Sequence, residues 1–68
     1  MIERFNCGHG KVEDNVYRGS RTRCRACVSA RAYLSSHDEL TPEALVEESD
    51  ERYRDNVPKA LDPEWSGW

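Results

Sequence analysis

Three cysteines and one histidine at short spacings constrain this 68-residue chain more than any other feature. The pattern is Cys7-Gly8-His9, then fourteen residues, then Cys24-Arg25-Ala26-Cys27. A chain of this length rarely buries enough apolar surface to fold unaided, so it usually needs a disulfide, a metal ion or a partner. Because a closed set of disulfides cannot use up an odd number of cysteines, the pattern favours a metal site.

The four side chains have the chemistry of a structural zinc site, which commonly takes three thiolates and one imidazole in a tetrahedron. A Cys-x-x-Cys step at the start of a helix also favours thiolates, because free backbone N–H groups point at the sulfurs there. The alternative is that the step is redox-active or merely buried, but it lacks the strand–helix–strand context of a redox motif. The sequence therefore predicts zinc bound by Cys7, His9, Cys24 and Cys27.

The first segment, residues 1–36, carries the signals of a hairpin followed by a helix. Residues 12–18 and 21–24 are short strand candidates on either side of the turn Gly19-Ser20. Residues 26–34 have the periodicity of a helix. We therefore expect a small α+β domain in which a β-hairpin and a helix surround the zinc ion.

The second segment, residues 37–68, carries the signals of an acidic helix and an irregular tail. Thr41 is a capping residue, Pro42 suits the first helical position, and Glu43 is an acidic residue in the first turn. The helix is predicted to run to about Asp55.

The apolar stripe of this second helix is thin. Leu45 and Tyr53 share one face with Val46 beside it, so the helix must dock on something to be stable. Two i,i+4 ion pairs are expected along it, Glu48–Arg52 and Asp50–Arg54.

Charge is divided unevenly along the chain, whose net charge is −3. Residues 1–34 hold seven basic and three acidic groups, which gives +4, and residues 35–68 hold three basic and ten acidic groups, which gives −7. The acidic composition therefore hides a basic first half. No signal peptide or membrane-spanning stretch is evident, so we expect a cytoplasmic protein, in which thiols stay reduced.

Three motifs resemble the zinc-binding segment of many bacteriophage and actinobacterial HNH-type proteins. They are Cys7-Gly8-His9, Asn15-Val16-Tyr17 and Arg23-Cys24-Arg25-Ala26-Cys27. The resemblance covers about residues 5–34. It implies a treble-clef-like zinc finger in a phage-encoded accessory protein, which would act in the cytoplasm of the host bacterium.

The catalytic part of that family is not matched. Those nucleases continue with an Asp-His pair and later Asn and His residues, whereas here only His37-Asp38 appears, in reversed order. One histidine cannot supply both the general base and the metal ligands of such a nuclease. We therefore interpret His37 as a linker residue or as a partner of the helix C-terminus, and we expect a binding module, not an enzyme.

Arginines cluster in the basic half. On an extended strand Arg21, Arg23 and Arg25 would share one face, and arginine is the preferred residue for forked contact with phosphate. These arginines could instead keep the domain soluble or pair with the acidic half. We expect nucleic-acid binding through the set Arg18, Arg21, Arg23, Arg25 and Arg31.

The acidic helix and the tail support a different function. Trp65 and Trp68 are residues of the kind found at interface hot spots, which favours an adaptor or inhibitor that binds a host protein. The other interpretation, which we favour, is that both tryptophans fold back to complete a thin core.

Overall fold

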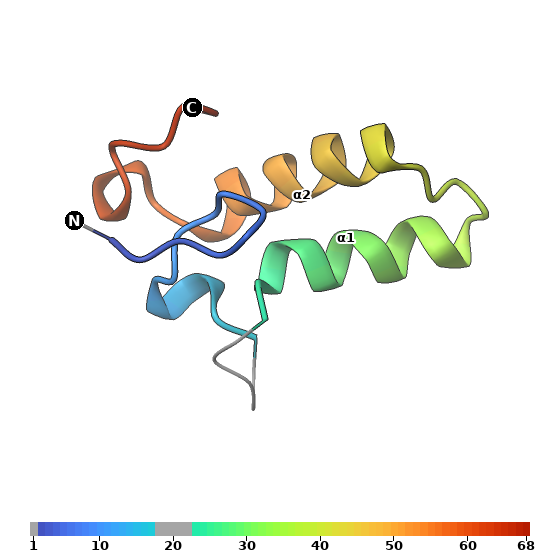
Figure 1. Cartoon of the computed structure of the whole chain (residues 1–68), viewed down its shortest axis with the longest axis horizontal. Coiled ribbons are helices and arrows are strands. Elements are labelled where there is room, and N and C mark those ends of the chain that lie inside the picture. Colours follow the sequence, from blue (N-terminus) through green and yellow to red (C-terminus); the bar gives the residue numbers. More distant parts are fainter. Residues whose placement is uncertain (1, 18–22) are drawn as a thin grey trace.

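The computed structural model describes residues 2–17 and 23–68, and it is built on two helices that pack side by side (Figure 1). These are α1, Arg25–Ser36, and α2, Pro42–Asn56. Two short 3-10 helices complete the elements, η1, Glu13–Asn15, and η2, Lys59–Leu61. The N-terminal residues and the C-terminal tail lie at one end of the helix pair, opposite the connection over residues 37–41.

The predicted β-hairpin is not formed by the described residues. Two isolated antiparallel bridges are present instead, Arg4 with Gly10 and Val16 with Cys24. The predicted strand over 12–18 is wrong at its centre, because η1 occupies residues 13–15 and the Asn15 N–H donates to the Val12 carbonyl at 2.9 Å. The predicted turn Gly19-Ser20 lies outside the described residues. The fold is therefore mainly helical, with little strand.

Helix α1 begins directly after Cys24 and extends two residues beyond the predicted 26–34. Its buried face consists of Ala26, Ala30 and Leu34, and two of these are small residues that let α2 approach closely. The helix ends where Asp38 takes a left-handed backbone conformation with φ of 55°.

Helix α2 begins as the sequence predicts. The Thr41 Oγ1 atom accepts a hydrogen bond from the Ala44 N–H at 3.1 Å. The Glu48–Arg52 pair is also formed, at 2.8 Å. The buried face is carried by Ser49 and Tyr53. Val46 is 60% exposed.

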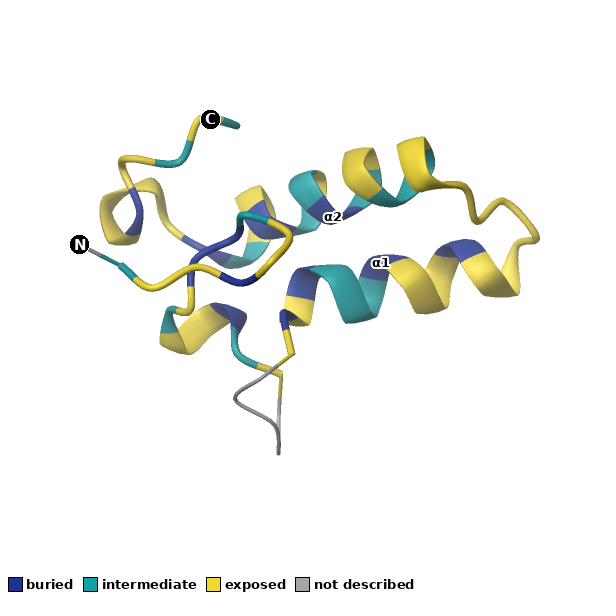
Figure 2. Cartoon of the chain, viewed as in Figure 1, coloured by how far each residue is buried: buried dark blue, intermediate teal, exposed yellow. Residues whose placement is uncertain are grey.

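The core joins the two halves of the chain at the end of the helix pair. It contains Phe5, Cys24, Ala26, Tyr53 and Val57. Figure 2 shows the buried positions along the facing sides of α1 and α2 and in the N-terminal loop. Trp65 and Trp68 are partly buried against this core, as the favoured interpretation of the tail expects. Within the described part of the chain, no helix has the length and apolar character needed to cross a bilayer.

Candidate metal centre

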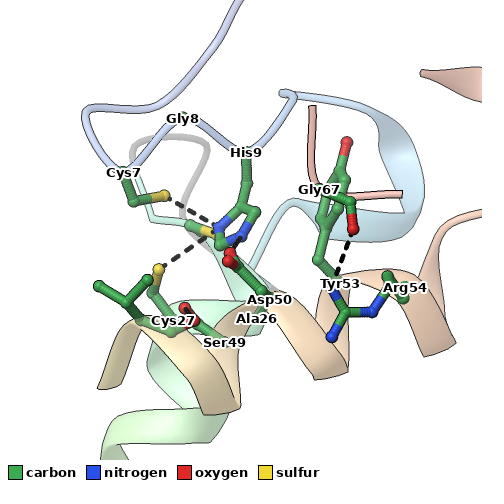
Figure 3. Close-up of polar contacts among 12 residues, drawn as sticks. Cys7, Gly8, His9, Ala26, Cys27, Ser49, Asp50, Tyr53, Arg54 and Gly67 are labelled. Atoms are coloured by element: carbon green, nitrogen blue, oxygen red, sulfur yellow. Dashed lines mark hydrogen bonds and ion pairs between the residues drawn. The ribbon is translucent and has the colours of Figure 1, made fainter. Parts of the chain in front are cut away.

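Four potential ligands converge between the N-terminal loop and the start of α1. Cys7 and His9 come from the loop, Cys24 directly precedes α1, and Cys27 lies in its first turn. One ligand atom from each lies within 4.8 Å of all the others, and the three cysteines are free thiols (Figure 3). The four residues predicted from the sequence are therefore brought together, and they could hold a metal ion.

The distances from His9 to the three sulfurs fit a tetrahedral ion. The Nδ1 atom of His9 lies 3.2 Å from the sulfur of Cys7, 3.4 Å from that of Cys24 and 3.6 Å from that of Cys27. Bonds of roughly 2.3 Å to sulfur and roughly 2.0 Å to nitrogen at tetrahedral angles put the two ligand atoms about 3.5 Å apart. One imidazole nitrogen thus faces three sulfurs at the separation that such a site needs.

A tight turn brings Cys7 and His9 to the same side. The Gly8 N–H donates to the Phe5 carbonyl and the Phe5 N–H donates to the His9 carbonyl, both at 2.9 Å. Gly8 has φ of 93°, in the left-handed region that glycine adopts without a steric cost. This backbone conformation explains why a glycine separates the two ligands.

Asp50 holds the far side of the imidazole. Its Oδ1 atom lies 2.7 Å from the Nε2 atom of His9, and the histidine is 1% exposed (Figure 3). A carboxylate on the second nitrogen is the usual way to fix the ring and tautomer of a metal-bound histidine. The predicted pairing of Asp50 with Arg54 is wrong: no Asp50–Arg54 pair forms within the described residues, and Arg54 donates to the Gly67 carbonyl instead.

Asn15 holds Cys24 from the other side. Its Nδ2 atom donates to the Cys24 sulfur at 3.3 Å and to the Gly10 carbonyl at 3.1 Å, while its Oδ1 atom accepts from the Ala26 N–H at 3.1 Å. The side chain is fully buried. It therefore links the N-terminal loop, one ligand and the Ala26 N–H in the first turn of α1.

A second buried network ties the tail to the same place. The Tyr53 ring stacks on the His9 ring at 4.7 Å, and its hydroxyl donates to Asp62 at 2.7 Å. The Asp62 carboxylate also accepts two hydrogen bonds from Arg4, at 2.7 and 2.8 Å. The Arg4 hydrogen bonds outweigh the opposing effect of burial and lower the pKa of Asp62. Asp62 therefore remains a buried carboxylate, paired with a residue 58 positions away.

Gly10 allows this network to close. A Cβ atom at this position would lie 2.9 Å from the Tyr53 hydroxyl and 3.2 Å from Asp62 Oδ2. The Gly10 N–H itself donates to the Tyr53 hydroxyl at 3.2 Å. The glycine thus lets the loop backbone come into hydrogen-bonding distance of α2.

The electrostatics of the sulfur cluster suit a cation. A hydrogen bond with Cys27 lowers the pKa of Cys24 to about 3, although burial opposes the shift. The same contact with Cys24, together with burial, raises the pKa of Cys27. Burial also raises the pKa of Cys7. Without a nearby positive charge the three crowded thiols do not all ionise. A bound metal ion would supply that charge and allow three thiolates to form.

The predicted arginine face is only partly described. Arg18 and Arg21 lie outside the described residues. Arg23, Arg25 and Arg31 are exposed. The expected alternation on a strand is wrong for Arg25, because this residue is the first of α1 and donates to the Asp14 carbonyl at 3.4 Å.

The tryptophans predicted to bind a partner contact residues of the chain itself. Trp65 meets the Tyr53 ring edge-on at 4.7 Å and lies 5.5 Å from the His9 ring. Trp68 packs edge-on against Trp65 at 5.0 Å, and its indole N–H donates to the Asp62 carbonyl. Comparisons of the chain with family models, curated proteins and solved structures found no match.

Proposed function

We propose that this chain is a small zinc-binding module in which one structural zinc ion joins the N-terminal loop to α1. The observation that carries the proposal is the environment of His9. Its Nδ1 atom faces three free thiols and its Nε2 atom is held by Asp50. Three sulfurs and one imidazole are a typical structural zinc set, and four protein ligands leave no open position for a reacting water. We therefore propose a binding role rather than catalysis.

Metal analysis tests the zinc site. Protein purified under reducing conditions is expected to carry one zinc ion per chain, and His9→Ala is expected to lose it. His37→Ala is the matched control, because His37 is exposed at the end of α1 and should leave the metal content unchanged. Folded wild-type protein without metal would contradict the proposal.

The partner we propose for this module is nucleic acid. Arg23, Arg25 and Arg31 are exposed close to the zinc site, and guanidinium groups suit phosphate oxygens. The resemblance of residues 5–34 to phage HNH-type zinc segments supports a phage-encoded accessory protein that acts in the bacterial cytoplasm. The competing role is an adaptor that binds a protein through Trp65 and Trp68. Both side chains pack on the core around Tyr53, which leaves less aromatic surface exposed for such a partner.

A salt titration tests nucleic-acid binding. Labelled duplex and single-stranded oligonucleotides are titrated with zinc-loaded protein at low and physiological salt. On duplex DNA, an arginine that neutralises one phosphate contributes about 0.9 to the slope of log affinity against log salt, so Arg23→Ala should flatten the slope by about that amount. Lys59→Ala is the control, because Lys59 is an exposed cation on η2. Flat binding curves at both salt concentrations would exclude nucleic acid as the partner while leaving the zinc site untouched.

A further inference from the structure

A groove of about 620 Å³ runs along one face of α1. Cys27, Val28, Arg31 and Ser35 line it and follow one another at intervals of one helical turn or less, so they share this face. Leu45 of α2 lines the same groove. Because Cys27 is also a potential metal ligand, the groove lies directly beside the metal centre.

The lining of the groove combines apolar surface with positive charge. Val28, Ala32 and Leu45 supply the apolar part, and the exposed residues Arg23 and Arg31 supply two guanidinium groups. None of the described residues that line the groove is acidic, and none of the ion pairs among the described residues includes either arginine. Although the chain is acidic overall, a ligand with both anionic and apolar parts therefore finds complementary surface here.

Tyr17 adds an aromatic ring next to one of these arginines. Val16 and Cys24 form an antiparallel bridge, and the Tyr17 N–H donates to the Arg23 carbonyl at 3.0 Å. Tyr17 therefore lies beside Arg23, and it is 38% exposed. An exposed ring beside an exposed guanidinium group is a combination that suits a base next to a phosphate.

We propose that Tyr17 and the groove between Arg23 and Arg31 bind single-stranded nucleic acid. The two guanidinium groups bind phosphates, and base faces lie on the Tyr17 ring and on the apolar floor of the groove. The inference rests on the proposed binding of nucleic acid and narrows it to unpaired strands.

The apolar surface is what favours a single strand over a duplex. In a duplex the bases are stacked on one another and only their edges reach the grooves, so Val28, Ala32 and Leu45 would have no base face to cover. In a single strand the faces are open and can lie on aromatic or apolar side chains. Phosphate contact alone would use the arginines and leave this surface without a role.

Fluorescence anisotropy with three labelled probes of equal length tests the inference. The probes are an oligothymidylate, the same strand paired with its complement, and an abasic strand that keeps the phosphates but has no bases. At low salt, zinc-loaded protein is expected to bind the oligothymidylate at least about 5-fold more tightly than the abasic strand, which is the effect of one stacked base. It should also bind the oligothymidylate more tightly than the duplex.

The outcomes separate this inference from the proposed function on which it rests. Equal affinity for the oligothymidylate and the abasic strand would overturn the inference, and so would a duplex that binds as tightly as the single strand. Binding of the duplex alone would still leave nucleic acid as the partner, whereas binding of no probe would overturn both. Unlabelled polyglutamate should displace the strand poorly. Displacement as effective as that by unlabelled oligothymidylate would overturn the inference and indicate an acidic peptide as the occupant.

Two matched pairs of variants locate the site. Tyr17→Ala should lower the affinity for the oligothymidylate by about 5-fold or more and leave the abasic strand unaffected. Tyr33→Ala is its control, because Tyr33 is 43% exposed but does not line the groove. Ala32→Glu places a carboxylate in the groove and should weaken binding far more than Ala60→Glu, which adds the same charge at an exposed position of η2. All four variants should retain wild-type zinc content, and equal losses within either pair would overturn the inference.

Discussion

At the scale of single residues, Asp50 determines how firmly the His9 ring is held, because its carboxylate lies 2.7 Å from Nε2. Asp50→Asn removes the charge that fixes the ring. Losing such an outer partner typically weakens metal affinity by about 10- to 100-fold, and we expect a loss in this range. Competition with a chromogenic zinc chelator measures it. Asp55→Asn, an exposed position on the same helix, should retain wild-type affinity.

Arg4 is expected to contribute substantially to the free energy of unfolding, although it is only the fourth residue of the chain. Its side chain is 32% exposed, but its partner Asp62 is 0% exposed. Arg4→Met would leave a buried carboxylate with only the Tyr53 hydroxyl, and an unpaired buried polar group costs on the order of 2 kcal/mol of unfolding free energy. Chemical denaturation of the zinc-loaded protein measures the change.

The matched comparison for Arg4 is Arg52, which is similarly exposed but pairs with Glu48, whose side chain is 23% exposed and keeps contact with water. Pairs of this i,i+4 kind on a helix typically contribute about 1 kcal/mol or less, so Arg52→Met should cost less than Arg4→Met. Equal losses of unfolding free energy in the two variants would show that the burial of Asp62 does not make the Arg4–Asp62 pair more stabilising.

At the scale of the elements, the Thr41 side chain caps the start of α2 by accepting a hydrogen bond from the Ala44 N–H. Thr41→Ala removes this cap and should lower the unfolding free energy by about 1 kcal/mol. Thr41→Ser keeps the hydroxyl and should stay close to the wild type. Denaturant unfolding compares the three proteins, and a Thr41→Ala variant as stable as the wild type would refute the role of the cap.

Local signals explain which elements could be predicted. The Thr41-Pro42 start of α2 and the Cys-x-x-Cys step before α1 are encoded within a few residues, and both helices and all four ligands are predictable from such signals. At residues 13–15 a 3-10 helix replaces the predicted strand, and in this conformation the buried Asn15 side chain reaches Cys24 and Ala26. Strand propensity depends on the residues of the segment itself and carries no information about contacts with residues that are distant in the sequence.

The residues that support the site, Asp50 and Asp62, could not be predicted either, because their partners are distant in the sequence. Asp50 is 41 residues from His9, and Asp62 is 58 residues from Arg4. In the sequence Asp50 has an equally good local partner in Arg54, four residues further on. Only the packing of α2 against the loop makes His9 the partner that is realised.

At the scale of the whole molecule, the metal site and the tail form one unit. His9 contacts Tyr53 and Trp65, and Tyr53 in turn binds Asp62. The core that remains is small, so the binding free energy of the ion is expected to supply much of the folding free energy. Removal of zinc should therefore release the tail as well as the ligands.

Chelation tests this coupling. Zinc removal under reducing conditions should abolish most of the helical circular dichroism and shift the tryptophan emission to the red, because Trp65 and Trp68 lose the cover of Tyr53 and His9. Both signals should return together on addition of one equivalent of zinc. Trp65→Phe and Trp68→Phe, measured separately, show whether both rings report the change. If the helices persist without metal while only the emission shifts, then zinc orders the tail but does not hold the α1–α2 pair together.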